Sequence, residues 1–285
     1  MQDILTCAMG LDIHRDVIVA CLAKGELGTD PEIEIRSFST LIPEMRKLRD
    51  WVLEAECRYV AMESTGIYWQ PIYEMLEPCF DGQISILVVN ARHMKNVPGR
   101  KTDMRDAQWI ATLLRAGLLK GSFIPDKTFR ELRHLTRYRK SIVRDITAQK
   151  NRIDKFLQSS GFRFTAFLSD AFGASGRNII RHLMEYGNIS REALDRCLKT
   201  QTRKRIDEIL IALNGSLSEH QRGFLRMIFG HLEALEQHRH TVEDAITKEI
   251  TKHEEALSLL CSIPGIDVTA AAAIIAEIGT DMSAF

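Results

Sequence analysis

The sequence predicts a mixed α/β domain followed by an all-α region, and three observations lead to this fold class. Strand and helix signals alternate as far as Pro125, strand signals then stop, and two long helical stretches follow at 130–158 and 218–256. In the first part three strands come before any helix, and helices and strands then alternate. This is the element order of a domain built on a central sheet.

Each element of the α/β domain has its own pattern. Short runs rich in β-branched and aromatic residues predict strands, and apolar residues at helical spacing predict helices, the one at 67–76 despite Pro71. Strands are expected at 7–13, 17–23, 33–39, 59–65 and 84–90, and helices at 42–56, 67–76 and 102–116.

The all-α region has the periodicity of a coiled coil. In 130–158 apolar residues fill six of eight heptad a/d positions, and Arg139 and Gln149 fill the other two. Short helices punctuated by glycine are expected in 161–216. The stretch 218–256 predicts one uninterrupted helix about 58 Å long at 1.5 Å per residue.

Composition excludes several classes of protein. The 285 residues have a formal net charge of zero, so overall charge indicates neither a nucleic acid nor a membrane partner. The six cysteines include no CxxC pair, which fits reduced thiols better than a disulfide framework or a zinc site. The apolar runs are too short to span a bilayer, and no signal peptide is evident. We expect a cytoplasmic protein with no membrane partner.

The segment 260–279 predicts a second kind of helical unit. An IPGI turn separates two apolar helical segments, as in a helix-hairpin-helix, whose backbone N–H groups can bind phosphate. Asp267 would place a carboxylate near any phosphate bound there, which should weaken that contact.

Four acidic residues are candidates for a metal site: Asp12 in a predicted strand, Glu63 at the end of another, and Asp103 and Asp106 at i and i+3 of a predicted helix. A central sheet could bring these three elements together. Like charges at that helical spacing repel, and a divalent cation turns the repulsion into attraction. Taken singly, each acid is more often solvated or a helix cap, and it is the combination that favours a metal site.

A basic segment surrounds the two helical acids. Residues 92–163 contain 18 Lys and Arg against 6 Asp and Glu, an excess that the neutral total conceals. Cations beside an acidic metal cluster are what a nuclease-like site needs to hold a phosphate backbone. Lys95, Arg100, Lys101 and Arg105 are the candidates for nucleic-acid contact; a solvated helix face is the alternative.

Several motifs together resemble those of the DEDD transposases of the insertion sequence 110 family. The motifs are GLDIHRD, MESTGIYW, VNARHMKNVPGRKTDMRDAQWIA, LSDAFGASGRNII and IPGIDVTAAAAIIAEIGTDMSAF. The resemblance implies a ribonuclease H-like (RuvC-like) catalytic domain at 1–128, a coiled-coil dimerisation region at 129–256, and the beginning of a helical transposase domain at 257–285. It also implies that Asp12, Glu63, Asp103 and Asp106 are catalytic ligands of Mg²⁺ or Mn²⁺.

The resemblance further implies a DNA transposase or recombinase that cuts and exchanges strands of donor and target DNA in a bacterial cell. A bridge-type noncoding RNA would guide it, and the coiled coil would make a homodimer or a higher homo-oligomer. The nucleophilic serine of the family is expected beyond Phe285, and Ser283 is not assigned that role. On this interpretation the chain is truncated and does not complete strand transfer by itself.

Two other functions remain open from the sequence. One is a non-catalytic nucleic-acid-binding remnant that acts as a dominant-negative regulator. The other is a RuvC-like junction endonuclease that uses the four acids alone. His14 and His93 could contact phosphate or metal, although polar turn residues are the simpler interpretation.

Overall fold

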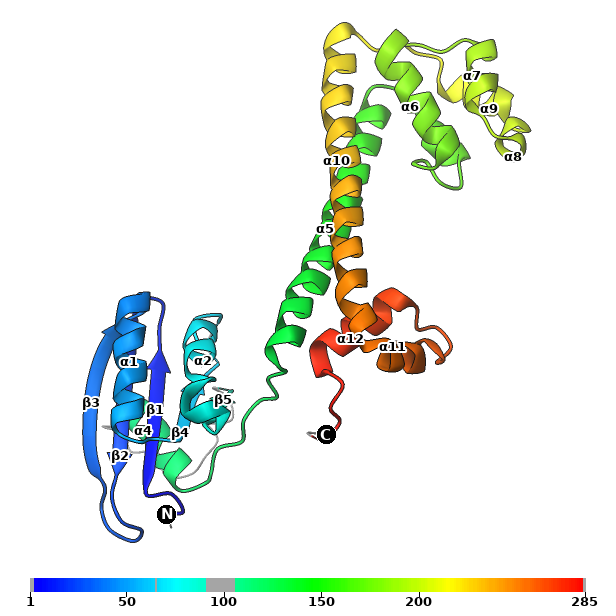
Figure 1. Cartoon of the computed structure of the whole chain (residues 1–285). Coiled ribbons are helices and arrows are strands. Elements are labelled where there is room, and N and C mark those ends of the chain that lie inside the picture. The colour runs from blue at the N-terminus through cyan, green and yellow to red at the C-terminus, as the bar shows by residue number, and fades with distance from the viewer. Residues whose placement is uncertain (1–2, 65, 91–105, 284–285) are drawn as a thin grey trace. The chain divides into compact units, whose positions relative to one another are not determined.

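The computed structural model describes residues 3–64, 66–90 and 106–283, with Ser283 as the last described residue. The chain divides into two compact units, Met1–Ile124 and Pro125–Phe285. The first unit combines a sheet with helices, and the second is helical throughout its described part (Figure 1).

The sheet unit has the predicted element order. Its strands are β1 (Cys7–Ile13), β2 (Val17–Lys24), β3 (Glu32–Ser39), β4 (Tyr59–Glu63) and β5 (Ser85–Val89), and its helices are α1 (Ile42–Glu54), α2 (Gln70–Leu76) and α4 (Asp106–Arg115). The predicted start of α2 at residue 67 is wrong. The helix begins at Gln70, so that Pro71 falls in the first turn, where a missing N–H costs nothing. The predicted start of α4 at residue 102 lies outside the described residues.

The five strands form one mixed sheet in the order β3-β2-β1-β4-β5. β1 pairs with β2, and β2 with β3, in antiparallel fashion, whereas β4 runs parallel to both β1 and β5. This topology is compatible with the ribonuclease H-like fold that the resemblance implies.

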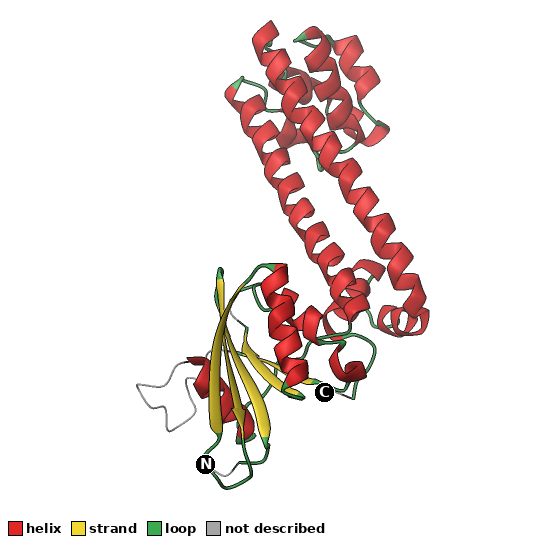
Figure 2. Ribbon diagram, turned by 60° about the vertical axis from the view of Figure 1, so that its left-hand side comes forward, coloured by secondary structure: helices red, strands yellow, loops and turns green. Residues whose placement is uncertain are grey.

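Helices cover both faces of the sheet, and the two faces differ in the size of their side chains (Figure 2). On the face of α1 and α2, large residues such as Met9, Leu11 and Met62 pack in one core with Leu48 and Trp51. On the α4 face the sheet presents small residues, among them Ala8, Ala23 and Ala61. Small side chains let the α4 backbone approach the sheet closely.

The helical unit is built on two long antiparallel helices. Its helices are α5 (Lys127–Ser159), α6 (Ala174–Tyr186), α7 (Arg191–Cys197), α8 (Thr200–Arg203), α9 (Ile206–Ala212), α10 (Glu219–Ile250), α11 (Glu254–Cys261) and α12 (Val268–Ile278). α5 and α10 lie side by side within the one chain. α6 to α9 gather at one end of this pair, and α11 and α12 lie at the other (Figure 1).

The seam between α5 and α10 contains the predicted apolar residues and both predicted exceptions. Arg139 donates to Glu243 Oε1 on α10, with an Nε–Oε1 distance of 2.8 Å. Gln149 is buried, and its Nε2 donates to the carbonyl of Ile228 at 2.6 Å. A buried polar residue at a seam position is satisfied in one register only, so these two residues help to fix the alignment of the helices.

The predicted uninterrupted helix over 218–256 is wrong at its C-terminal end. It starts as expected, because the hydroxyl of Ser218 and the side chain of Gln221 form a capping box. It ends at Ile250, and Thr251–His253 form a 3₁₀ turn that leads into α11. The ring of His253 packs on that of Phe129 with centroids 4.7 Å apart, so a tertiary contact, rather than a glycine or proline, accompanies the break.

The predicted helical hairpin is present as α11, a turn and α12. Gly265 in the turn has φ +90°, a conformation that favours glycine. Asp267 Oδ1 accepts a hydrogen bond from the Ala270 N–H at 2.7 Å, and so caps α12 with the carboxylate that the sequence places there.

All six cysteines are free thiols, in agreement with the prediction from their spacing. Within the described part of the chain, no helix combines the length and the apolar character needed to cross a membrane.

Candidate functional site

Two of the four candidate carboxylates are carried by neighbouring parallel strands. Asp12 is the second-last residue of β1, and Glu63 is the final residue of β4. The two strands are in register through Leu11 and Met62, so Asp12 and Glu63 occupy the next position on each strand. Side chains alternate along a strand, and both residues therefore share the face of Gly10 and Ala61, which is the face that α4 covers.

The third carboxylate, Asp106, is the first residue of α4. A single close approach fixes where this helix lies. A Cβ atom on Gly10 would overlap the carbonyl oxygen of Ala107 and the backbone nitrogen of Ala111, so only glycine fits in β1 at this point. Gly10 thus allows the start of α4 to lie against the strand that carries Asp12, two residues further on.

The charges of Asp106 and Glu63 act on Asp12. Burial raises the pKa of Asp12 above its usual range, and the charges of Asp106 and Glu63 raise it further. His14 opposes these effects, both through its charge and through a hydrogen bond. Repulsion of this kind between carboxylates is typical of acids that bind a metal ion or share a proton.

His14 makes a contact that the sequence did not predict. Its Nε2 lies 3.2 Å from Asp12 Oδ2, while the imidazole itself is largely exposed. In the tautomer with the proton on Nε2, the ring donates to the carboxylate and orients it. The signal in the sequence is the D-x-H spacing at the end of a strand, because residues two apart point to the same side.

The chemistry of this donor set suits a hard divalent cation. Carboxylate oxygens are the preferred ligands of Mg²⁺ and Mn²⁺. In the described part of the chain, however, no three His, Cys, Asp or Glu side chains are close enough to hold a metal ion together. Asp103, the fourth candidate, lies outside the described residues, and so do the four candidate nucleic-acid contacts, Lys95, Arg100, Lys101 and Arg105, and the alternative candidate His93.

The motif LSDAFGASGRNII, in the helical unit, has a structural explanation. A Cβ atom on Gly176 would overlap the carbonyl oxygen of Ala171, so the loop and the first turn of α6 can pack only around glycine. The hydroxyl of Ser175 accepts from the N–H of Lys199 at 3.0 Å, and Arg177 donates to Phe172 O at 2.6 Å. The motif therefore joins α6 to its neighbours.

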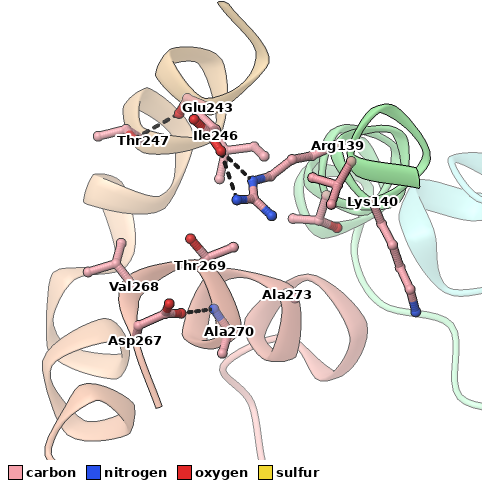
Figure 3. A pocket seen from close by; sticks show the side chains of 12 residues that line it. Arg139, Lys140, Glu243, Ile246, Thr247, Asp267, Val268, Thr269, Ala270 and Ala273 are labelled. Carbon is pink, nitrogen blue, oxygen red and sulfur yellow. Dashed lines mark hydrogen bonds and ion pairs between the residues drawn. The ribbon is translucent and has the colours of Figure 1, made fainter. Parts of the chain in front are cut away.

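A pocket of about 640 Å³ lies in the helical unit between α5, α10 and α12 (Figure 3). Its polar groups are largely engaged with one another. Arg139 is paired with Glu243, and Asp267 caps α12. Apolar residues such as Val143 and Val268 line much of the rest. The pocket offers no nucleophile and base in contact, so the carboxylate cluster on the sheet is the better candidate for chemistry.

Comparison with known families places the chain in one of them. A family model described as a transposase, the DEDD transposase of the insertion sequence 110 type, matches residues 9–161. No curated protein matches the chain. The matched segment starts within β1, contains Asp12, Glu63, Asp103 and Asp106, and ends just after α5. Because the match covers more than half of the 285 residues, the chain belongs to the insertion sequence 110 family of DEDD transposases.

Proposed function

We propose that this transposase cleaves phosphodiester bonds of DNA, and takes part in strand exchange, at a metal site formed by Asp12, Glu63, Asp103 and Asp106. The observation that carries the proposal is the electrostatic coupling of Asp12 to Glu63 and Asp106, three acids from three separate elements on one face of the sheet. A chain gains nothing in stability from gathering like charges, so a ligand that needs them is the simplest reason for the arrangement.

The carboxylates would hold Mg²⁺ or Mn²⁺, which when bound polarises the scissile phosphate and stabilises the charge of the attacking and leaving oxygens. The protein's own part is positioning. β1 and β4 hold Asp12 and Glu63 at adjacent strand ends, and Gly10 lets the first turn of α4, which begins at Asp106, lie close to β1. His14 orients the Asp12 carboxylate through its ring nitrogen.

The partners follow from the same proposal. Lys95, Arg100, Lys101 and Arg105 would contact phosphates of donor and target DNA beside the site, and a structured noncoding RNA would guide target choice. Association of two or more copies through the helical unit would bring the two DNA partners together in the cytoplasm.

Isothermal titration of metal-free protein with Mn²⁺ tests the site directly. We expect saturable binding in the wild-type chain, and a loss of at least tenfold in affinity in Asp12→Asn and in Asp106→Asn, since each change removes one charged ligand. Glu54→Gln is the matched control. Glu54 is an exposed carboxylate on α1, which covers the opposite face of the sheet, and its removal should leave the affinity unchanged.

Equal Mn²⁺ affinity in Asp12→Asn and Glu54→Gln would contradict the proposed site. Nicking of branched DNA by the 285-residue chain alone, abolished in Asp12→Asn, would instead favour a junction endonuclease. Nucleic-acid binding without any metal binding would favour a non-catalytic regulator.

A further inference from the structure

The two long helices of the helical unit differ sharply in charge. α5 contains ten Lys and Arg against three Asp and Glu, whereas α10, of nearly equal length, contains four against six. Both helices bury one face in the same seam, so packing alone does not require the difference. The excess on α5 needs another explanation.

Contacts within the helical unit account for part of the excess. Arg139 pairs with Glu243 across the seam. Arg137 makes a two-pronged pair with Glu277 of α12, with Nε–Oε1 and Nη2–Oε2 distances of 2.8 and 2.9 Å, and Arg133 also reaches Glu277. These pairs lie in the half of α5 that packs against α12, and they leave the other cations of the helix to be explained.

Three of the remaining cations form a stripe, Lys140, Arg144 and Lys155. At 100° per residue they fall within an arc of about 60°, on the side opposite the buried seam residues Ile142 and Ile153. All three are exposed, and none of them has an ion pair among the residues that the structure describes. Figure 3 shows Lys140 extending away from the Arg139–Glu243 pair.

On α5 itself the residues around this stripe are polar, and no acid of the helix falls within its arc. Glu277 of α12 lies on the same side of α5, nearer its N-terminus, where Arg133 and Arg137 pair with it. Ser141 and Asn151 are exposed between the cations and can donate hydrogen bonds, whereas the hydroxyl of Thr147 donates to the carbonyl of Val143 at 3.0 Å. The nearest acids, Asp145 and Asp154, lie roughly 100° and 80° away from Arg144 around the helix, on its flanks. Asp154 also accepts from Gln158 at 2.7 Å, which engages its carboxylate.

We propose that the stripe of Lys140, Arg144 and Lys155 is a second nucleic-acid contact surface, which binds the phosphate backbone of a duplex. The stripe extends over about 22 Å of straight helix. A DNA duplex of that length presents on the order of 13 phosphate charges, and cations with hydroxyl and amide donors between them are the groups that contact phosphates. This proposal rests on the proposed function. It adds a place, away from the carboxylates, where a nucleic-acid partner is held.

The absence of apolar and aromatic side chains from the stripe favours a duplex over other polyanions. Single strands are usually bound by stacking of bases on aromatic rings, and membrane-surface helices insert an apolar face. In and beside the arc of the three cations the exposed residues are Thr147, Ala148 and Asn151, and the exposed Val143 lies on the flank, about 60° from Lys140. The stripe therefore suits contact with the phosphate backbone, which does not depend on base sequence.

Fluorescence anisotropy with 20-base-pair duplexes of DNA and of RNA tests the surface. The variant carries Lys140→Gln, Arg144→Gln and Lys155→Gln, and the matched control carries Lys199→Gln, Lys204→Gln and Lys248→Gln, three exposed cations of the same unit away from the stripe. EDTA is present throughout, so that metal binding does not contribute. We expect the stripe variant to lose at least tenfold in affinity at ~0.1 M salt and its log–log salt slope to fall by about two to three, while the control changes neither.

Comparing the DNA and RNA duplexes shows which of them the stripe binds. A loss of affinity for either duplex in the stripe variant supports the proposed surface. Asp12→Asn should bind as the wild type does, so failure of the carboxylate site leaves this result intact. Protection of Lys140 and Lys155 from acetylation in the duplex complex of the intact wild-type chain provides a second readout that needs no variant. Equal affinity and equal salt slope in the two triple variants, absence of duplex binding by the wild type, or unprotected lysines in its complex would overturn the proposal.

Discussion

The candidate site of the sheet unit and the contact between α6 and α10 in the helical unit arrange charge in opposite ways. In the sheet unit, Asp12 is partly buried, and its pKa is raised by burial and by the charges of Asp106 and Glu63. In the helical unit, acids and bases are paired between helices: Arg177 and Arg181 of α6 bind Glu236 and Glu233 of α10. Paired opposite charges serve the fold, whereas like charges held together are retained at the expense of stability. The contrast supports the metal site proposed in the sheet unit.

Removing the close approach at Gly10 should have the largest effect. In Gly10→Val the new side chain would overlap the backbone of Ala107 and Ala111, so α4 has to move away from β1. We expect a loss of about 3 kcal/mol or more in the free energy of unfolding, measured by urea denaturation, together with weaker Mn²⁺ binding.

Gly223→Ala provides the matched control for this prediction. Gly223 lies in α10, and a Cβ atom there meets nothing within 4 Å. Alanine has the higher helix propensity, so this change should stabilise the protein by about 0.5–1 kcal/mol. Similar unfolding free energies for the two variants would show that α4 does not depend on Gly10.

The charge pairs of the helical unit should have an intermediate effect. Arg177 Nη2 donates to both carboxylate oxygens of Glu236, at 2.6 and 2.8 Å, and both side chains are about one-fifth exposed. We expect Glu236→Gln to cost about 1–2 kcal/mol, because it leaves a largely buried guanidinium without its counter-charge. A double-mutant cycle with Arg177→Met measures the coupling by chemical denaturation.

The same cycle on Arg191 and Asp207 is the control, since that pair is fully on the surface. Its coupling should be small and should vanish in high salt. If the effects of the Arg177 and Glu236 substitutions on the unfolding free energy are simply additive, the ion pair does not stabilise the helical unit. The contrast with the acids of the sheet unit then fails.

Sequence patterns predict the elements well where the signal is local. The strand from Cys7 to Ile13 and the capped start of α10 at Ser218 depend on neighbouring residues, and both agree with the structure. The end of α10 at Ile250 was missed, because no local breaker marks it and His253 packs against Phe129, more than a hundred residues away in the chain.

The candidate site shows the same limit. The sequence supplies the acids and the strand ends that carry them, and the parallel register of β1 and β4 then places Asp12 and Glu63 at adjacent positions. The sequence does not show why residue 10 is glycine, because the backbone carbonyl that excludes a side chain there belongs to Ala107, on a distant segment. The contact of His14 with Asp12 was missed for a related reason: a histidine after a strand also fits a solvated turn.

Asp12→Asn tests the central claim most directly, by thermal and urea unfolding at pH 7 in EDTA and again in saturating Mn²⁺. The pKa of Asp12 is raised in the folded chain, so the folded state holds this proton more tightly than the unfolded state, and the charged carboxylate costs stability once the pH exceeds its folded pKa. In EDTA the variant should therefore be more stable than the wild type. In Mn²⁺ at about 100 times the dissociation constant, the wild type should gain about 2.7 kcal/mol, the variant far less, and the order should reverse. An unchanged order in the two conditions would contradict a metal site built on Asp12.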